Sequence, residues 1–271
     1  MHRRWAATGS PTAVPDGASS VRAMALHPFL EWPGPMAFAH RGGASDHPEN
    51  TMPAFQHAVD LGYTFLETDV HATADGVLVA FHDASLDRTT DRSGVISDLP
   101  WSEVGEARVD GREPIPLFEE FMEQFPDARM NVDCKADSAM DALIASLRRL
   151  NCLDRVLIGS FSDRRLRRLR REFGDDLCSS FGPVQITSLR LTGRVPWGGQ
   201  VAQVPVRYGQ VPIVSERFVE RAHRRGLQVH VWTIDEPAEM HRLLDLGVDG
   251  LMTDRPGVLK QVLVERGDWH A

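Results

Sequence analysis

From Met36 onward, short apolar runs alternate with longer segments of helical period, a pattern that few folds can accommodate. A helix between two buried strands carries the chain back to the edge where the next parallel strand begins. Nine segments have the character of buried strands: 36–40, 65–70, 77–82, 130–135, 156–160, 177–180, 201–206, 228–232 and 250–253. Seven segments have helical period: 51–61, 117–125, 138–150, 163–173, 215–225, 237–246 and 257–266.

The connection between the second and third strands is too short for a parallel crossover, which needs a dozen or more residues. It reads HATADG and ends in the turn pair Asp75-Gly76. We therefore predict that segment 77–82 runs antiparallel to its predecessor, which leaves eight parallel strands. This favours a (β/α)8 TIM barrel over residues 35–271, with a small insertion after the third strand at about 86–112. Residues 1–34, rich in Ala, Ser, Pro and Gly, are predicted to be a flexible extension.

Net charge and hydropathy limit the kinds of molecule that the protein is expected to bind. A net charge of −8 argues against a nucleic-acid groove but not against one small phosphate. No apolar run approaches the roughly 20 residues of a membrane helix, so no integral membrane segment is expected. The N-terminal stretch lacks the apolar core of a secretory signal, and a cytoplasmic location is expected. Cys134, Cys152 and Cys178 show no CxxC spacing and predict free, buried core residues.

Two carboxylates on one strand are the first sign of chemistry. Glu67 and Asp69 lie two residues apart in FLETDV, so both side chains point to the same face of an otherwise apolar strand. Like charges held this close repel each other unless a cation lies between them, and oxygen ligands suit Mg²⁺ or Ca²⁺. A divalent-metal site is therefore favoured over a pair of solvated strand-end acids.

Asp133 and Lys135 repeat this spacing in MNVDCKAD. An acid and a base then share one face of a second buried strand, where such residues are rare unless they are paired or functional. Asp133 is a candidate third metal ligand, and Lys135 is a candidate phosphate-binding cation. The alternative is a structural ion pair between them.

Two histidines complete the candidate set. His40 opens HRGG directly after the first strand, and Arg41 beside it offers a planar fork of donors for phosphate oxygens. The two glycines of HRGG allow positive φ or a close backbone approach. His82 ends the antiparallel segment in VAFHD. Histidines on either side of a phosphate supply the general acid and base that phosphoester cleavage requires.

Neighbouring residues are expected to support these groups. We expect Asp83 to cap the turn after His82 rather than to orient that ring, and Glu49 to reach Arg41. His71 shares the strand parity of the two metal-facing acids. For it, an exposed position at the strand end is favoured over a part in the site.

In order, the motifs HRGG, PENT, ETD, DG, FHD and RTT, followed by NVDCK, VWT and GVDGLMTDRP, resemble the glycerophosphodiester phosphodiesterase family. The similarity covers about residues 36–263. It implies a barrel of the phospholipase C-like phosphodiesterase type that hydrolyses small-molecule glycerophosphodiesters to glycerol 3-phosphate and an alcohol. It also implies a divalent metal cofactor, Mg²⁺ or Ca²⁺. The oligomeric state does not follow from the sequence.

The resemblance implies a role for each candidate residue. These are His40 and His82 as catalytic acid and base; Arg41 and Lys135 at the phosphate; Trp232 as an apolar wall for the glycerol; Glu67, Asp69 and Asp133 as metal ligands; and Glu49 as a support. The family usually has Glu at the position of Asp133, so the metal preference is less firmly implied than the rest.

Other functions remain open. A phospholipase acting on lysophospholipid or sphingolipid headgroups would need an apolar surface for acyl chains, and the scattered apolar residues of 86–112 do not favour it. A silent phosphate-binding protein would have lost a histidine or a metal-binding acid, and this chain retains them. The arginine-rich segment 163–172 is interpreted as the solvated face of an amphipathic helix in preference to a membrane-binding surface. Whether water or the substrate's 2-hydroxyl is the nucleophile is not decided by the sequence.

Overall fold

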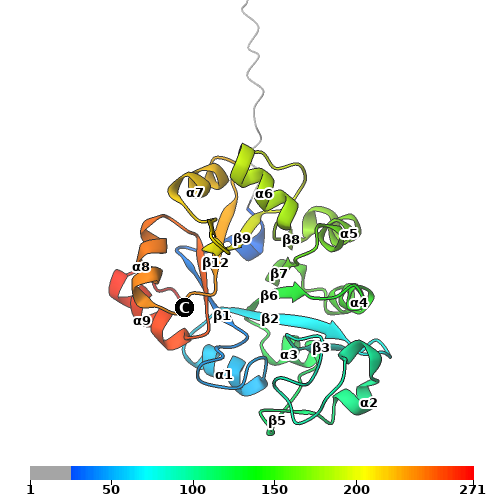
Figure 1. The fold of residues 1–271 in the computed structure, drawn as a ribbon. Coiled ribbons are helices and arrows are strands. Elements are labelled where there is room, and N and C mark those ends of the chain that lie inside the picture. The colour runs from blue at the N-terminus through cyan, green and yellow to red at the C-terminus, as the bar shows by residue number, and fades with distance from the viewer. Residues whose placement is uncertain (1–25) are drawn as a thin grey trace, which may run out of the picture.

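The computed structural model of the protein describes residues 26–271. Its main sheet has nine strands, eight of which are parallel and follow the order β8-β7-β6-β2-β1-β13-β12-β9. A parallel bridge from Ser180 to Val201 joins the ends of this order, so the sheet closes into a barrel (Figure 1). The strands are β1 (Met36–His40), β2 (Phe65–Ala72), β6 (Arg129–Cys134), β7 (Val156–Gly159), β8 (Cys178–Ser179), β9 (Val201–Pro205), β12 (Gln228–Trp232) and β13 (Gly250–Thr253).

Helices surround the barrel, and within the described chain one lies between each pair of successive parallel strands, with a last one after β13 (Figure 1). The predicted (β/α)8 TIM barrel is therefore confirmed. The helices are α1 (Met52–Asp60), α3 (Phe118–Gln124), α4 (Met140–Leu150), α5 (Asp163–Phe173), α6 (Pro183–Thr192), α7 (Glu216–His223), α8 (Pro237–Asp245) and α9 (Pro256–Arg266).

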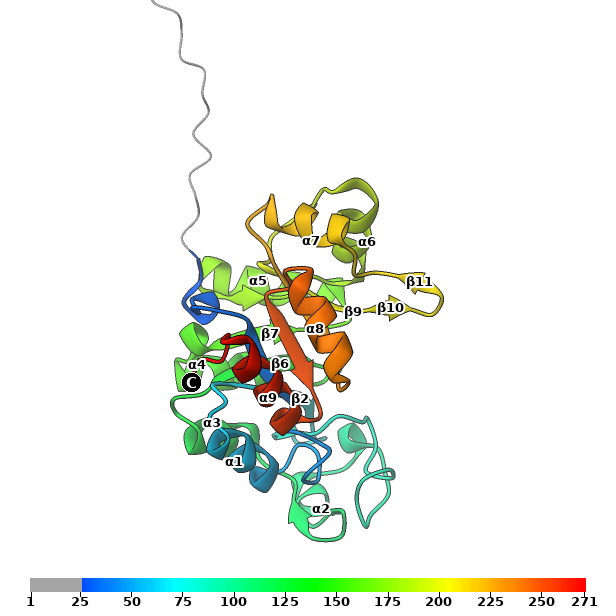
Figure 2. The ribbon, with the colours of Figure 1, turned by 90° about the vertical axis from the view of Figure 1, so that its left-hand side faces the viewer.

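Two elements on one side of the barrel were not predicted. Helix α6 buries Leu189 but leaves Val184 and Leu191 exposed, so its apolar residues form no single stripe that would mark a helix. After β9, a short antiparallel hairpin of β10 (Arg207–Tyr208) and β11 (Val211–Pro212) extends away from the barrel, as Figure 2 shows. Both elements border the functional site.

The antiparallel excursion after β2 is confirmed. Strand β3 (Leu78–Ala80) pairs with β2 in the antiparallel sense, with Val70 opposite Ala80. It is shorter than the predicted segment 77–82, but the backbone N–H of Phe81 still donates to the carbonyl of Asp69 at 2.9 Å. His82 is therefore held beside the C-terminal part of β2.

The insertion that follows has a small core of its own. It contains α2 (Trp101–Val104) and an antiparallel pair formed by β4 (Arg108–Val109) and β5 (Glu113–Pro114). Leu86, Ile96 and Val104 are buried together in it. Because most of its apolar side chains already have partners, the insertion offers little free apolar surface.

The interior of the barrel is apolar at one end and polar at the other. Met36 and Phe38 lie in an apolar cluster at the N-terminal ends of the strands, and His40, on the same strand face, lies at the opposite end. Phe29 and Leu30, in a short 3₁₀ helix (Pro28–Leu30), are buried in the same cluster. The folded part therefore begins before the expected boundary at residue 35. Of the extension predicted for residues 1–34, residues 1–25 lie outside the described residues.

Three of the six arginines of α5 form ion pairs with acids at or just before the start of α4. Arg164 and Arg165 both contact Asp137, and Arg168 contacts Asp141 at the start of α4. These contacts fit the interpretation of α5 as an ordinary barrel helix. No helix within residues 26–271 is long and apolar enough to cross a membrane. The three cysteines are free and buried, as predicted.

Candidate active site

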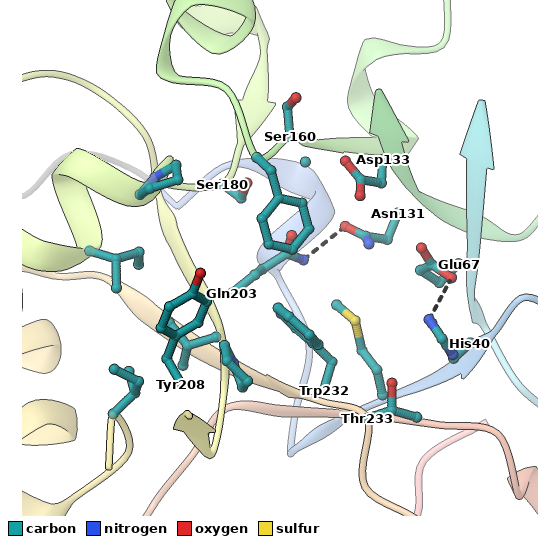
Figure 3. Close-up of a pocket in the computed structure, with 18 of the residues that line it drawn as sticks. His40, Glu67, Asn131, Asp133, Ser160, Ser180, Gln203, Tyr208, Trp232 and Thr233 are labelled. Carbon is teal, nitrogen blue, oxygen red and sulfur yellow. Dashed lines mark hydrogen bonds and ion pairs between the residues drawn. The ribbon is translucent and has the colours of Figure 1, made fainter. Parts of the chain in front are cut away.

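A cavity of about 640 Å³ lies at the C-terminal ends of the barrel strands. Figure 3 shows His40 and Glu67 on one side of it and Tyr208 on the other. All but one of the predicted site residues line this single cavity: His40, Arg41, Glu67, Asp69, His82, Asp133, Lys135 and Trp232. Glu49 contacts Arg41 from outside the cavity lining, so the structure brings all the predicted site residues together.

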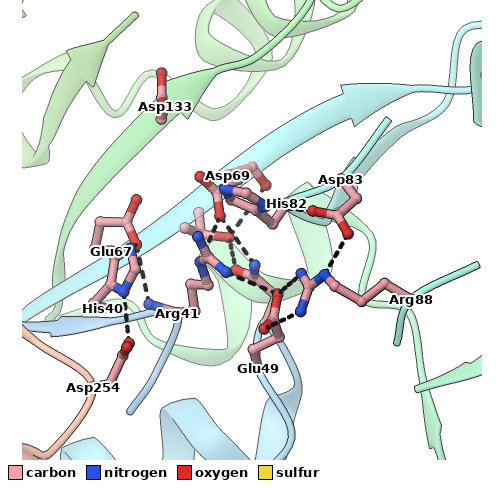
Figure 4. Close-up of polar contacts among 12 residues, drawn as sticks. His40, Arg41, Glu49, Glu67, Asp69, His82, Asp83, Arg88, Asp133 and Asp254 are labelled. Carbon is pink, nitrogen blue, oxygen red and sulfur yellow. Dashed lines mark hydrogen bonds and ion pairs between the residues drawn. The ribbon is translucent and has the colours of Figure 1, made fainter. Parts of the chain in front are cut away.

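His40 ends β1 and is oriented by an acid that the sequence reasoning did not assign. Its Nδ1 lies 2.6 Å from Oδ1 of Asp254, which directly follows β13 (Figure 4). Because a carboxylate only accepts, Nδ1 carries the hydrogen, and Nε2 is left for chemistry. Asp254 is held in turn by its own backbone N–H, which donates to Asp235 at 2.8 Å. An acid directly after the last strand was the available signal for this pair.

The charge around His40 favours its protonated form. Burial alone would lower the pKa of His40, but the carboxylates of Glu67 and Asp254 outweigh that effect and raise it. Nε2 of His40 is 3.8 Å from Oε2 of Glu67. The ring is therefore in surroundings that favour its carrying a proton.

His82 is oriented in the same way, which corrects the expectation for Asp83. Oδ1 of Asp83 lies 2.6 Å from Nδ1 of His82, so this carboxylate orients the ring rather than capping the turn. Its other oxygen accepts from Nε of Arg88 at 2.5 Å, and this bond is the main reason that the pKa of Asp83 falls to about 2. Asp83 therefore stays ionised and holds the hydrogen on Nδ1 of His82.

Glu49 joins the two histidine-bearing segments through arginines. It accepts from Nη1 of Arg41 at 3.0 Å, as predicted, and from Nη2 of Arg88 in the insertion at 2.6 Å (Figure 4). Nε of Arg41 lies 3.3 Å from Asp69. Arg41 itself adopts a positive φ of 54°. This turns its side chain back across the end of β2, where its charge offsets that of the buried acid.

The two glycines after Arg41 are required by packing against helices. Gly42 has φ of 85°, and a Cβ there would lie 2.8 Å from the backbone of Ala54 in α1. Gly43 has φ of 99°, and its Cβ would lie 2.6 Å from Pro256 of α9. The HRGG turn therefore fits tightly between two helix ends, which fixes the direction of His40 and Arg41.

Lys135 lies between two carboxylates. Its Nζ is 2.8 Å from Asp69 and 2.8 Å from Asp133. Burial would raise the pKa of Asp69, but Lys135 and then Arg41 overcome it, so this carboxyl is held ionised. The ion pair considered from the sequence is thus present, and it also involves the first acidic strand.

A divalent cation agrees with this acidic set in donor chemistry. Within residues 26–271, no three His, Cys, Asp or Glu side chains are grouped closely enough to enclose a metal. However, Oδ1 of Asp133 is buried and has no hydrogen-bond partner among the described residues. Burial, followed by the charge of Asp69, raises the pKa of Glu67. A nearby cation would give Oδ1 of Asp133 a partner and would favour the ionised form of Glu67. Carboxylate oxygens are also the ligands that hard cations prefer.

His71 is not the exposed strand-end residue that was expected. Its side chain is buried, and Nε2 lies 3.1 Å from the backbone carbonyl of His82. Burial lowers the pKa of His71, which favours the neutral ring that donates this bond. His71 does not line the cavity, and its contact instead fixes the backbone that carries His82.

The floor and the far wall of the cavity change from polar to apolar. Nε2 of Gln203 donates to Oδ1 of Asn131 at 2.8 Å across the floor, a pair that the sequence reasoning missed. Trp232, the predicted apolar wall, packs edge-on against Phe161 with ring centroids 5.7 Å apart. Nζ of Lys135 lies 5.9 Å from the centre of the Phe161 ring. The aromatic pair therefore borders the charged groups of the cavity.

Cationic side chains and acids gathered at the mouth of a TIM barrel suit a phosphorylated ligand. A sequence model described as the glycerophosphoryl diester phosphodiesterase family matches residues 40–258. The chain belongs to this family. The predicted resemblance is thus confirmed.

Individual relatives agree with this assignment. A Mycobacterium tuberculosis protein assigned as glycerophosphodiester phosphodiesterase 2 is 42% identical, over 89% of this chain and 95% of its own length. The rat (Rattus norvegicus) lysophospholipase D GDPD1 is 30% identical, over 83% of this chain and 85% of its own. A phosphodiesterase of Oleispira antarctica, solved with its product sn-glycerol 3-phosphate, superposes with a TM-score of 0.72 at 21% identity, over 85% of this chain and 97% of its own.

Proposed function

We propose that this phosphodiesterase hydrolyses glycerophosphodiesters to glycerol 3-phosphate and an alcohol, with His40 and His82 as general acid and base and with a divalent cation. The observation that carries the proposal is the pairing of each histidine with its own carboxylate in one cavity. Asp254 holds Nδ1 of the first ring, and Asp83 holds Nδ1 of the second. In each ring Nε2 is then the nitrogen left to take or give a proton.

The two histidines come from different elements of the barrel. His40 ends β1 beside Glu67, and His82 follows β3, which pairs with β2 beyond Asp69. Both rings therefore lie along the C-terminal part of β2, and the proposal places the phosphate between them. One ring removes a proton from the nucleophile, and the other donates a proton to the departing alkoxide. The two rings have similar carboxylate partners. The pH dependence of the rate in variants of each histidine would identify the base.

Arg41 and Lys135 are the phosphate-binding groups of the proposal. Both line the cavity, and both also contact Asp69. Their charges offset the charge that develops on the phosphoryl oxygens in the transition state. Their contacts with Asp69 hold them in place before substrate arrives, so little reorganisation is needed during the reaction.

Glu67, Asp69 and Asp133 would hold the cation. When bound, a divalent cation supplies Lewis-acid polarisation of a phosphate oxygen and a template for the substrate. The chain's own acids contribute ligand oxygens, and Lys135 serves as their counter-ion. Asp133 is one methylene shorter than the usual glutamate, and its unpartnered Oδ1 supports a role as a ligand.

A product assay tests the proposal. The protein, treated with EDTA and then given Mg²⁺, Ca²⁺ or Mn²⁺, is incubated with glycerophosphocholine, and choline and glycerol 3-phosphate are measured. We expect equal amounts of both products and a metal-dependent rate. Trapping of a cyclic 1,2-phosphodiester would identify the 2-hydroxyl as the nucleophile, whereas its absence in rapid-quench samples would indicate water. Absence of both products with every metal would contradict the proposed function.

A further inference from the structure

The cavity continues beyond Trp232 as an apolar groove. Its walls are formed by helix α6 and by the hairpin with the segment that follows it. We name this groove the apolar arm and define it by five lining residues: Ile186, Leu191, Tyr208, Val211 and Ile213. In Figure 3, Tyr208 lies across the pocket from His40 and Glu67, so the apolar arm leads away from the charged groups.

The side chains of the apolar arm are unusually exposed for their size. Leu191 is 64% exposed, Tyr208 78% and Val211 45%. Eight large apolar side chains are exposed in the described part of the chain, and four of them, including Phe161, line this one cavity. Scattered exposed apolar residues need no explanation, but a cluster continuous with a binding cavity indicates an apolar ligand.

The apolar arm is held together by contacts that leave its apolar surface free. Nε of Arg190 donates to the carbonyl of Pro212 at 3.2 Å, which ties α6 to the end of the hairpin. Leu189 of the same helix is fully buried and anchors α6. Among the described lining residues of this part of the cavity, Arg190 is the single charged side chain. The apolar arm therefore has no group that could serve the chemistry, and its contribution is binding.

We propose that the apolar arm binds the acyl chain of a lysophospholipid, so that the substrates include glycerophosphodiesters with one acyl chain on the glycerol. This inference rests on the proposed function. Trp232 lies between the charged groups and the apolar arm, so a glycerol placed against it directs its chain into the groove. In the insertion at 86–112 most apolar groups are buried, whereas α6 and the hairpin provide such a surface.

The reaction on such a substrate is a balanced hydrolysis. With 1-acyl-glycerophosphocholine, the oxygen of water forms a bond to phosphorus, and the bond from phosphorus to the choline oxygen breaks. One proton from water goes to the choline oxygen, and the other stays on the phosphate product or passes to solvent. The products are choline and 1-acylglycerol 3-phosphate, and neither an oxidant nor a second substrate is needed.

Short-chain substrates provide the test, because they remain monomeric at concentrations where longer lysophospholipids form micelles. The assay compares glycerophosphocholine with its 1-hexanoyl, 1-octanoyl and 1-decanoyl derivatives below their critical micelle concentrations, with choline release as the readout. We expect kcat/KM to rise about two- to fourfold for each methylene that enters the apolar arm. Equal kcat/KM for all four substrates would overturn the proposal while leaving the proposed function intact.

Variants of exposed residues assign the effect to the apolar arm. Leu191→Gln and Tyr208→Ser should flatten the dependence on chain length and leave kcat/KM for glycerophosphocholine unchanged. Val184→Gln is the matched control, because Val184 lies on the same helix, is 53% exposed and does not line the cavity. A chain-length dependence that persists in both arm variants, or that Val184→Gln abolishes equally, would contradict the assignment.

A binding measurement keeps the test independent of turnover. If none of these diesters is cleaved, the proposed function fails, and calorimetric titration with 1-octanoyl-glycerophosphocholine and with glycerophosphocholine still tests the groove. Tighter binding of the octanoyl compound, lost in Leu191→Gln, would support an acyl site. Equal affinity for the two compounds would overturn it.

Discussion

The two sides of the cavity are built on different principles. On the side of β1, β2 and β6, the charged groups are buried or partly buried and lie in contact with one another, as Asp69 does with Arg41 and Lys135. On the side of α6 and the hairpin, the lining is apolar and largely exposed. Charges removed from water need partners at fixed positions, whereas apolar surface needs only a complementary shape. Reaction chemistry should therefore depend on single atoms of the charged side, and substrate choice on the area of the apolar side.

The largest loss of activity is expected when either cavity histidine is replaced. His40→Ala and His82→Ala should each lower kcat by about 100-fold or more, by the same factor for plain and acylated diesters. Initial rates of choline release measure this, and circular dichroism shows whether the fold is kept. His57→Ala, which changes a partly exposed histidine outside the cavity, is the control. Near-normal rates in both cavity variants would contradict the proposal that these residues act as general acid and base.

Removal of the metal should be the next largest effect. We expect EDTA to abolish most of the activity and added divalent cation to restore it, because Glu67 and Asp133 then regain a counter-ion. The cation should also raise Tm, since a ligand that binds the folded state stabilises it. In Glu67→Gln neither rescue nor the Tm shift should occur, whereas Asp133→Glu should lower the cation concentration needed. Full activity after exhaustive chelation would show that the acids serve another purpose.

A smaller effect is expected from the acid behind His40. Asp254→Asn should lower kcat/KM by about 10- to 100-fold, because the ring loses the acceptor that fixes its tautomer. Asp254 is one of the groups that raise the pKa of His40, so its removal lowers that pKa. The limb of the pH–rate profile that His40 controls should therefore move to lower pH. Asp98→Asn, at an exposed site in the insertion, is the control and should leave the profile in place.

The smallest effect should come from the boundary between the two sides. Trp232→Ala should raise KM about three- to tenfold for plain and acylated diesters alike, with kcat within about twofold, because the wall contacts the glycerol that both share. Michaelis–Menten curves for both substrates separate the two parameters. Trp197→Ala, outside this cavity, is the matched control. A change confined to acylated diesters would move Trp232 into the apolar arm.

Much of the charged side could be predicted from sequence, because its residues end strands and their spacing follows strand parity. Glu67 and Asp69 fall on one face by the period of two, and the barrel then brings β1 and β6 beside them. Asp254 directly follows β13 and could have been found by the same reasoning, but Arg88 could not. Arg88 reaches Glu49 from the insertion, nearly 40 residues away in the sequence. Such contacts depend on how loops pack, which local patterns do not encode.

The apolar side escaped prediction for a different physical reason. A helix is identified by apolar residues confined to one face, and α6 exposes Val184 and Leu191 as well as burying Leu189. The two strands of the hairpin have two residues each, too short for any periodicity. The exposed apolar residues of α6 and the hairpin depart from the rule that apolar side chains are buried. A prediction that relies on this rule therefore does not find them.

Glu49 sets a lower limit on how far this enzyme could be trimmed. Its two oxygens accept from Arg41 at the end of β1 and from Arg88 in the insertion, and Arg88 also holds Asp83 behind His82. A version cut back to the bare eightfold repeat would lose Arg88, which links Asp83 beside His82 to Glu49 and, through Glu49, to Arg41 beside His40. Engineers who wish to shorten the protein should therefore spare residues 86–112 and begin their changes with the hairpin.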